Sequence, residues 1–181
     1  MSRRELLLLL PLLALYLSAW AFFPERPDDE AGYVALAERL TQGTYVTGDD
    51  EALLDDDPSS PDLWFGPGLP LLLTPLVALD APLSVLRLTG PLLLFGAMLL
   101  FHVLARDRWG PRTGLVSTYA LGLYLPFLGL LSNLHSEVLA IFFVVAAMLA
   151  IARYLERGGA IFFALGAAAL AGLAMTRVAY G

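Results

Sequence analysis

The sequence predicts an all-α integral membrane protein, a bundle of about five transmembrane helices with an acidic segment on the external side. Hydrophobic residues make up 58% of the 181 residues and charged residues only 15%, and the mean hydropathy is +0.71. These values are too apolar for an ordinary water-soluble domain. The apolar residues also fall into separate runs, several close to the length that a helix needs to cross a hydrocarbon core of about 30 Å.

Five apolar runs are expected to span the membrane. The first follows the basic start Arg3-Arg4, and it has a rival interpretation as a signal peptide, because Ala19-Trp20-Ala21 resembles a cleavage site. The later runs favour a retained anchor. The predicted spans are residues 6–23, 85–105, 114–132, 137–152 and 160–176.

An acidic segment separates the first two predicted spans. Residues 24–80 hold thirteen of the seventeen carboxylates, so the net charge of -6 has a local origin. Within it, apolar residues at positions 33, 36, 37 and 40 form one stripe, which predicts an amphipathic helix over residues 30–42. The chain therefore divides into a first span (1–23), an external loop (24–84) and the bundle of spans two to five (85–181).

The orientation depends on residues 66–79, which are apolar but short and contain three prolines. If this run spanned the membrane, five arginines of the later turns would lie outside, against the positive-inside bias. If it lies on the surface or re-enters, those arginines join Arg3 and Arg4 in the cytoplasm. We therefore expect a protein of the plasma (inner) membrane with a cytoplasmic N-terminus and an external acidic loop. The five arginines are at positions 106, 108, 112, 153 and 157.

Several classes of function are disfavoured. The chain has no cysteine, which excludes disulfides, thiolate nucleophiles and cysteine-bound metals, and it has no basic footprint for nucleic acid. No predicted span carries a clearly central charged residue, which counts against a transport path. His102 lies near the cytoplasmic end of span two, where packing or the interface accounts for it. The acids of residues 49–57 suit a divalent cation, but a solvated loop explains them better, and we expect no metal.

Asp29 and Glu30 are the first candidates for chemistry. They follow the first span almost directly, so their carboxylates are expected at the membrane surface, where one could act as a general base. The alternative is that Asp29 caps the following helix and stabilises its dipole. The two interpretations are compatible.

Further candidates lie near the external ends of the spans. The side chains of His135 and Glu137 can converge only if His135 precedes the helix of span four. The alternative is that Glu137 only stabilises the dipole of that helix, with Ser136 as its cap. Arg87 and Arg177 could hold phosphate oxygens in a bidentate fork, with snorkelling toward the interface as the alternative.

The order of these features resembles the N-terminal portion of the GT-C class of integral-membrane glycosyltransferases, in particular protein O-mannosyltransferases and lipid A aminoarabinose transferases. No single piece is specific, and the order and spacing carry the likeness across nearly all of the chain. The matching pieces are the short basic start, Asp29-Glu30-x-x-Tyr33, the run from Gly66 to Leu73, Leu86-Arg87-Leu88, Ser136-Glu137 and the run from Gly172 to Arg177.

The resemblance implies an inverting glycosyltransferase that acts at the external membrane face. Its donor would be a polyprenyl-phosphate-linked sugar and its acceptor a lipid, glycan or protein. Asp29 occupies the position of the family's base, with Glu30 beside it, and Arg177 resembles an arginine near the donor phosphate. A metal is not implied. Because relatives have roughly eight or more spans, the chain is expected to be a portion of such an enzyme that could be inactive alone; the alternatives are a transporter component or an assembly subunit.

Overall fold

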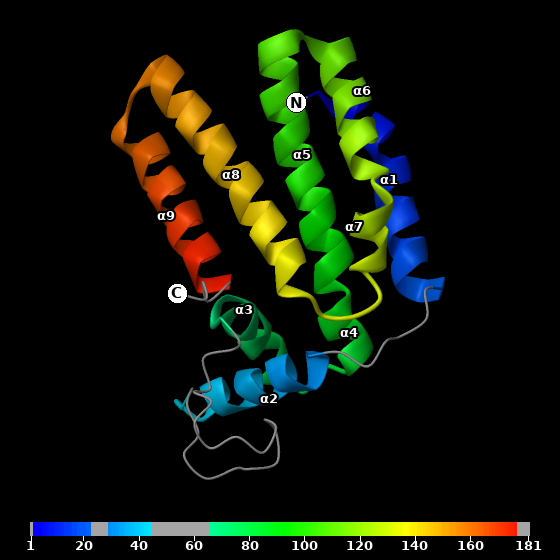
Figure 1. The fold of residues 1–181 in the computed structure, drawn as a ribbon, viewed down its shortest axis with the longest axis vertical. Helices are drawn as coiled ribbons and strands as arrows, with labels where there is room; N and C mark the ends of the chain where they lie inside the picture. The colour runs from blue at the N-terminus through cyan, green and yellow to red at the C-terminus, as the bar shows by residue number, and fades with distance from the viewer. Residues whose placement is uncertain (1, 23–28, 45–65, 177–181) are drawn as a thin grey trace.

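The computed structural model describes residues 2–22, 29–44 and 66–176. These residues form helices joined by turns (Figure 1). The predicted all-α fold is confirmed for these residues. In chain order the helices are α1 (Arg3–Phe22), α2 (Glu30–Thr41), α3 (Gly68–Val77), α4 (Leu83–Arg87), α5 (Thr89–Trp109), α6 (Pro111–Gly122), α7 (Leu125–Gly129), α8 (Ser136–Arg157) and α9 (Ala160–Thr176).

Within the described residues, three helical segments are long and apolar enough to cross a membrane. They are α1, the nearly continuous α4–α5 segment Leu83–Trp109, and α8. Helix α9 is apolar but has only 17 residues, so its crossing stays a prediction. Helix α3 has 10 residues and is about 15 Å long, half of a hydrocarbon core, which fits a surface or re-entrant position.

The predicted third span, residues 114–132, is wrong as a single helix. The chain forms α6, turns at Leu123 and Tyr124, and restarts as the short α7 with Pro126 in its first turn. Proline has no N–H to donate to the carbonyl of Gly122 four residues earlier, and its ring would clash with that carbonyl. The Tyr16 hydroxyl donates a hydrogen bond to this Gly122 oxygen instead, at 3.0 Å. The break is therefore stabilised by α1.

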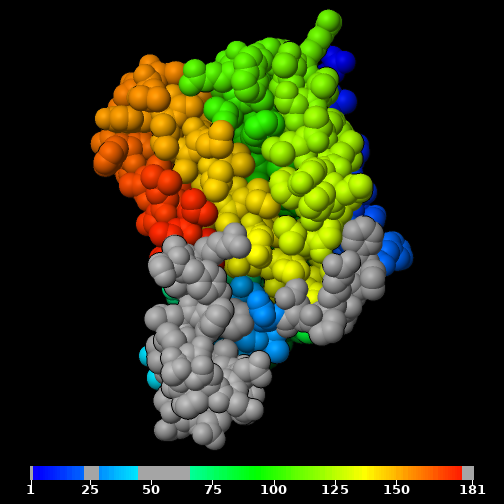
Figure 2. All heavy atoms as spheres, in the orientation of Figure 1, coloured from blue at the N-terminus to red at the C-terminus, as the bar shows by residue number. Residues whose placement is uncertain are grey.

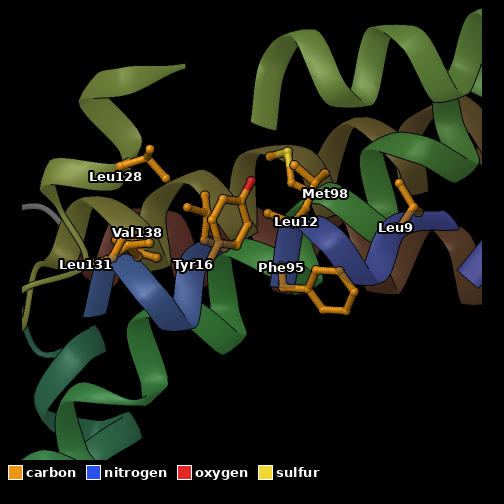
Figure 3. Close-up of a cluster of buried hydrophobic side chains, with 11 residues drawn as sticks. Leu9, Leu12, Tyr16, Phe95, Met98, Leu128, Leu131 and Val138 are labelled. Carbon is orange, nitrogen blue, oxygen red and sulfur yellow. The ribbon is translucent and has the colours of Figure 1, made fainter. Parts of the chain in front are cut away.

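Helix α5 is the centre of the bundle and contacts α1, α6 and α8 (Figure 1). In Figure 2 the α8–α9 hairpin and the α6–α7 segment form two ridges with α5 between them. The core joins α1 and α5 to α7 and to the start of α8, and Tyr16 lies among its aliphatic side chains (Figure 3). Its buried members are Leu9, Leu12, Tyr16, Ala19, Leu94, Phe95, Ala97, Met98, Leu128, Leu131 and Val138.

Basic residues gather at one end of the bundle. The N-terminus, the α5–α6 turn and the α8–α9 turn share this end (Figure 1). Ion pairs tie its helices together: Arg106 to Glu5 of α1 at 3.3 Å, and Arg153 of α8 to Asp107 of α5. The arginines expected in the cytoplasm, at positions 3, 4, 106, 108, 112, 153 and 157, all belong to this end.

Helices α2 and α3 lie at the opposite end, across the ends of the bundle helices (Figure 1). The amphipathic helix is confirmed, since α2 buries Tyr33, Leu36 and Ala37 of the predicted stripe, while Leu40 is partly exposed. A second apolar cluster joins α2 and α3 to α4 and α8. It contains Tyr33, Ala37, Leu69, Leu73, Leu86, Leu134 and Leu139.

Helix α3 also meets the end of α9. A Cβ on Gly66 would lie 2.5 Å from the Met175 carbonyl oxygen, and one on Gly68 would lie 2.9 Å from a Thr176 methyl carbon. Glycine is thus required for this close approach. The end of α9 is held beside α3, at the same end of the molecule as α2.

Candidate functional site at the α2 end of the bundle

The central interaction of this end is a bidentate ion pair between Glu30 and Arg87. Arg87 donates from Nε to Oε2 at 2.8 Å and from Nη2 to Oε1 at 2.7 Å. The two side chains are only 11% and 14% exposed. The backbone N–H of Leu134 also donates to Glu30 Oε2, at 3.1 Å. One carboxylate therefore ties the first turn of α2 to α4 and to the segment that leads into α8.

Tyr33 makes a second link one helical turn later. Its hydroxyl donates to the Ser136 hydroxyl at 3.0 Å, and both residues are buried. Residues three apart lie on the same face of a helix, and Glu30 and Tyr33 both face the chain around the start of α8. The start of α2 is thus fixed in position and in rotation about its axis.

Asp29 directly precedes this anchored turn and is exposed. It occupies the N-cap position of α2, and its backbone oxygen accepts from the Tyr33 N–H at 3.2 Å. Its side chain makes no capping hydrogen bond to α2. The side chain of Asp29 therefore does not cap α2 through a hydrogen bond. What remains of the capping interpretation is the favourable interaction of its charge with the helix dipole.

His135 and Glu137 flank the start of α8. His135 is the N-cap residue of α8 with an extended backbone, so it does precede the helix, and its Nδ1 lies 3.9 Å from Glu137 Oε2. The segment is close to Glu30 because Leu134, the residue before His135, donates to that carboxylate. The structure thus brings Asp29, Glu30, Tyr33, Arg87, His135 and Glu137 to one end of the bundle.

Arg177 lies outside the described residues, as do the acids of residues 49–57. Among the described residues no group of three or more acidic or histidine side chains is placed to hold a metal ion.

An open groove runs between α2 and the segment that joins α3 to α4. Its first part, of about 400 Å³, is lined by Glu30, Ala31, Val34, Ala35, Glu38, Ala81, Leu83 and Leu86. A second part of about 460 Å³ continues toward Gln42 and Asp80 and shares four lining residues with the first. The groove combines aliphatic walls with carboxylates, which can accept hydrogen bonds from hydroxyl groups.

Sequence reasoning missed the partners within this site. Glu30 and Arg87 were assigned separate roles, as a base candidate and as a phosphate ligand, yet they bind each other across 57 positions of sequence. The third partner is the backbone N–H of Leu134, and the residue type at a position does not reveal a backbone donor. The available hint was the polar pair Ser132-Asn133, which ends an apolar run just before α8; in the structure both residues are buried.

Comparisons with protein families, with curated proteins and with solved structures found no match to this chain.

Proposed function

We propose that this chain serves a GT-C-like membrane glycosyltransferase, which moves a sugar from a polyprenyl-phosphate-linked donor to an acceptor at the external membrane face. The observation that carries the proposal is the anchoring of the first turn of α2. Glu30 is held by Arg87 and Leu134, while the neighbouring Asp29 is exposed at the end of the bundle. These contacts hold the backbone that carries Asp29, and transfer to an acceptor beside a lipid-linked donor needs a base in a defined position.

In this mechanism Asp29 takes the proton from the acceptor hydroxyl or amine. The acceptor oxygen or nitrogen attacks the anomeric carbon as the bond from that carbon to the phosphate oxygen breaks. The electron pair of that bond leaves with the polyprenyl phosphate, and the configuration at the anomeric carbon inverts. A base within hydrogen-bond reach of the acceptor typically accelerates such a step by about 10² to 10⁴-fold.

Glu30 acts as a positioning residue in this scheme, because its oxygens already accept three hydrogen bonds. Arg87 donates to Glu30, so Arg177 is the stronger candidate for the donor phosphate, as the family resemblance implies. The groove beside Glu30 offers Glu38 and Asp80 to the hydroxyl groups of a sugar.

The test is a transfer assay in membranes that contain the complete protein, with radiolabelled polyprenyl-phosphate sugars as donors. Asp29→Asn should lower transfer at least a hundredfold while the protein folds and inserts normally. Glu156→Gln, which removes one carboxylate at the opposite end, is the matched control and should leave transfer unchanged. Normal turnover by the Asp29→Asn protein would remove Asp29 from the mechanism. Absence of transfer from any such donor by the unaltered protein would favour a non-catalytic membrane protein.

A further inference from the structure

A separate pocket lies at the basic end of the bundle, where α1, α5 and α6 meet. Its volume is about 340 Å³. It is far from the α2 end, and the proposed function does not use it. Its lining residues are Arg4, Glu5, Leu8, His102, Pro111, Arg112 and Leu115.

His102 lines this pocket, and one of its ring nitrogens, Nε2, has no hydrogen-bond partner among the described residues. The residue has no exposed surface, and no described residue forms a hydrogen bond with its Nε2. This atom lies 3.8 Å from Glu5 Oε1, too far for a hydrogen bond. The Nδ1 atom is 3.5 Å from Thr118 Oγ1, and that hydroxyl donates its own proton to the Gly114 carbonyl at 2.7 Å. Since a buried polar atom without a partner is unfavourable, Nε2 points to a missing ligand.

The charges around the pocket favour an anion. The charge of Glu5 is offset by its ion pair with Arg106 at 3.3 Å, and the same carboxylate accepts a hydrogen bond from the Ser2 N–H at 2.6 Å. Arg4 and Arg112 are exposed, and neither forms an ion pair with another described residue. Arg112 also lies in the first turn of α6, whose free N–H groups add positive potential.

The apolar walls favour a lipid over a free ion in water. Leu8 and Leu115 line the pocket, and Leu8 is 46% exposed on the outer face of α1. Val116, next to Leu115 on α6, is 69% exposed. These exposed aliphatic side chains, on the candidate span α1 and on the neighbouring α6, follow the arginines by about one helical turn and provide a path for acyl chains.

We propose that this pocket binds the headgroup of an anionic phospholipid of the phosphatidylglycerol type, with its phosphate between Arg4 and Arg112 and a headgroup hydroxyl donating to His102 Nε2. Guanidinium groups suit phosphate oxygens, and a neutral imidazole can accept from a hydroxyl. The lipid would join α1 to α6 at the membrane interface.

The experiment is native mass spectrometry of the purified complete chain in an uncharged detergent, titrated with phosphatidylglycerol, phosphatidylcholine or inorganic phosphate. We expect one phosphatidylglycerol to be retained in preference to phosphatidylcholine. Arg112→Gln should weaken its binding about tenfold, which corresponds to one charged hydrogen bond. Arg157→Gln removes the same charge at the same end but outside the pocket, so it should not change binding.

His102→Leu separates a ligand role from a structural one. It should weaken phosphatidylglycerol binding about tenfold, while the melting temperature without lipid stays the same or rises, because an unpaired polar atom is removed. A lower melting temperature with unchanged lipid binding would overturn the role of Nε2. Equal losses in Arg112→Gln and Arg157→Gln would show only general charge attraction and would overturn the site. Binding of inorganic phosphate as strong as that of phosphatidylglycerol would identify a soluble anion and not a lipid.

Discussion

Removing Arg87 should destabilise the protein strongly, because it would leave the Glu30 carboxylate without its cation in a largely buried position. The two side chains are 14% and 11% exposed, and they share hydrogen bonds of 2.8 and 2.7 Å. Breaking such a pair by removing one partner typically costs about 3–5 kcal/mol. We therefore expect Arg87→Leu to lower the free energy of unfolding by about 3 kcal/mol or more.

The double-mutant cycle distinguishes the pair from other contacts of the two residues. Glu30→Leu should also be destabilising, partly because the Leu134 N–H loses its acceptor. The variant with both substitutions removes both charges of this pair, so its loss should be smaller than the sum of the single losses by about 2 kcal/mol or more.

The measurement is reversible unfolding of the purified protein in mixed detergent micelles, followed by circular dichroism. Arg157→Leu, at the exposed end of α8, is the matched control and should change the free energy of unfolding by about 0.5 kcal/mol or less. Additive single losses, or an Arg87→Leu loss as small as that of the control, would refute the coupling and with it the anchoring of α2.

Two further predictions concern the break in the third predicted span and the contact between α3 and α9. Tyr16→Phe should cost about 1–3 kcal/mol, because it removes the donor to a buried carbonyl, whereas Tyr124→Phe, at an exposed ring, should have almost no effect in the same unfolding assay. Gly66→Ala should cost about 1–3 kcal/mol, because its Cβ would lie 2.5 Å from a backbone oxygen; Gly129→Ala, with nothing within 4 Å, should be neutral or slightly stabilising. If Tyr16→Phe lowered the free energy of unfolding no more than Tyr124→Phe, the Tyr16–Gly122 hydrogen bond would be contradicted. If Gly66→Ala lowered it no more than Gly129→Ala, the contact with the end of α9 would be contradicted.

The sequence predicted helices long and apolar enough to span a membrane, the helix α2 and the buried face of α2, because these follow from local hydrophobicity and its periodicity. It did not predict the break at Tyr124, although Pro126 is visible in the run. A proline in an apolar run can be kept within one transmembrane helix or can break it, so its presence alone does not decide between the two. At this break the Gly122 carbonyl is bound by the hydroxyl of Tyr16, 106 positions away, and a long-range partner of this kind cannot be read from one sequence.

The same limit applies to the candidate site. Glu30, Arg87 and His135 were correctly predicted to lie at one end of the bundle, because each adjoins the end of an apolar run in the sequence. It could not show that Glu30 and Arg87 bind each other, since that pairing depends on how α2 crosses the bundle. His102 was expected to be packed or interfacial; it is fully buried, and its Nε2 has no hydrogen-bond partner within the part of the chain that the structure describes.

The most direct test of the account is to determine on which side of the membrane the α2 end lies. The chain has no cysteine, so a single cysteine can be introduced at Glu38 on α2 or at Arg157 at the end of α8 without background labelling. With a membrane-impermeant maleimide on intact cells, we predict labelling of the Glu38→Cys protein, and labelling of Arg157→Cys only after the membrane is permeabilised. The reverse pattern would place the acidic end in the cytoplasm and contradict transfer from a donor at the external face.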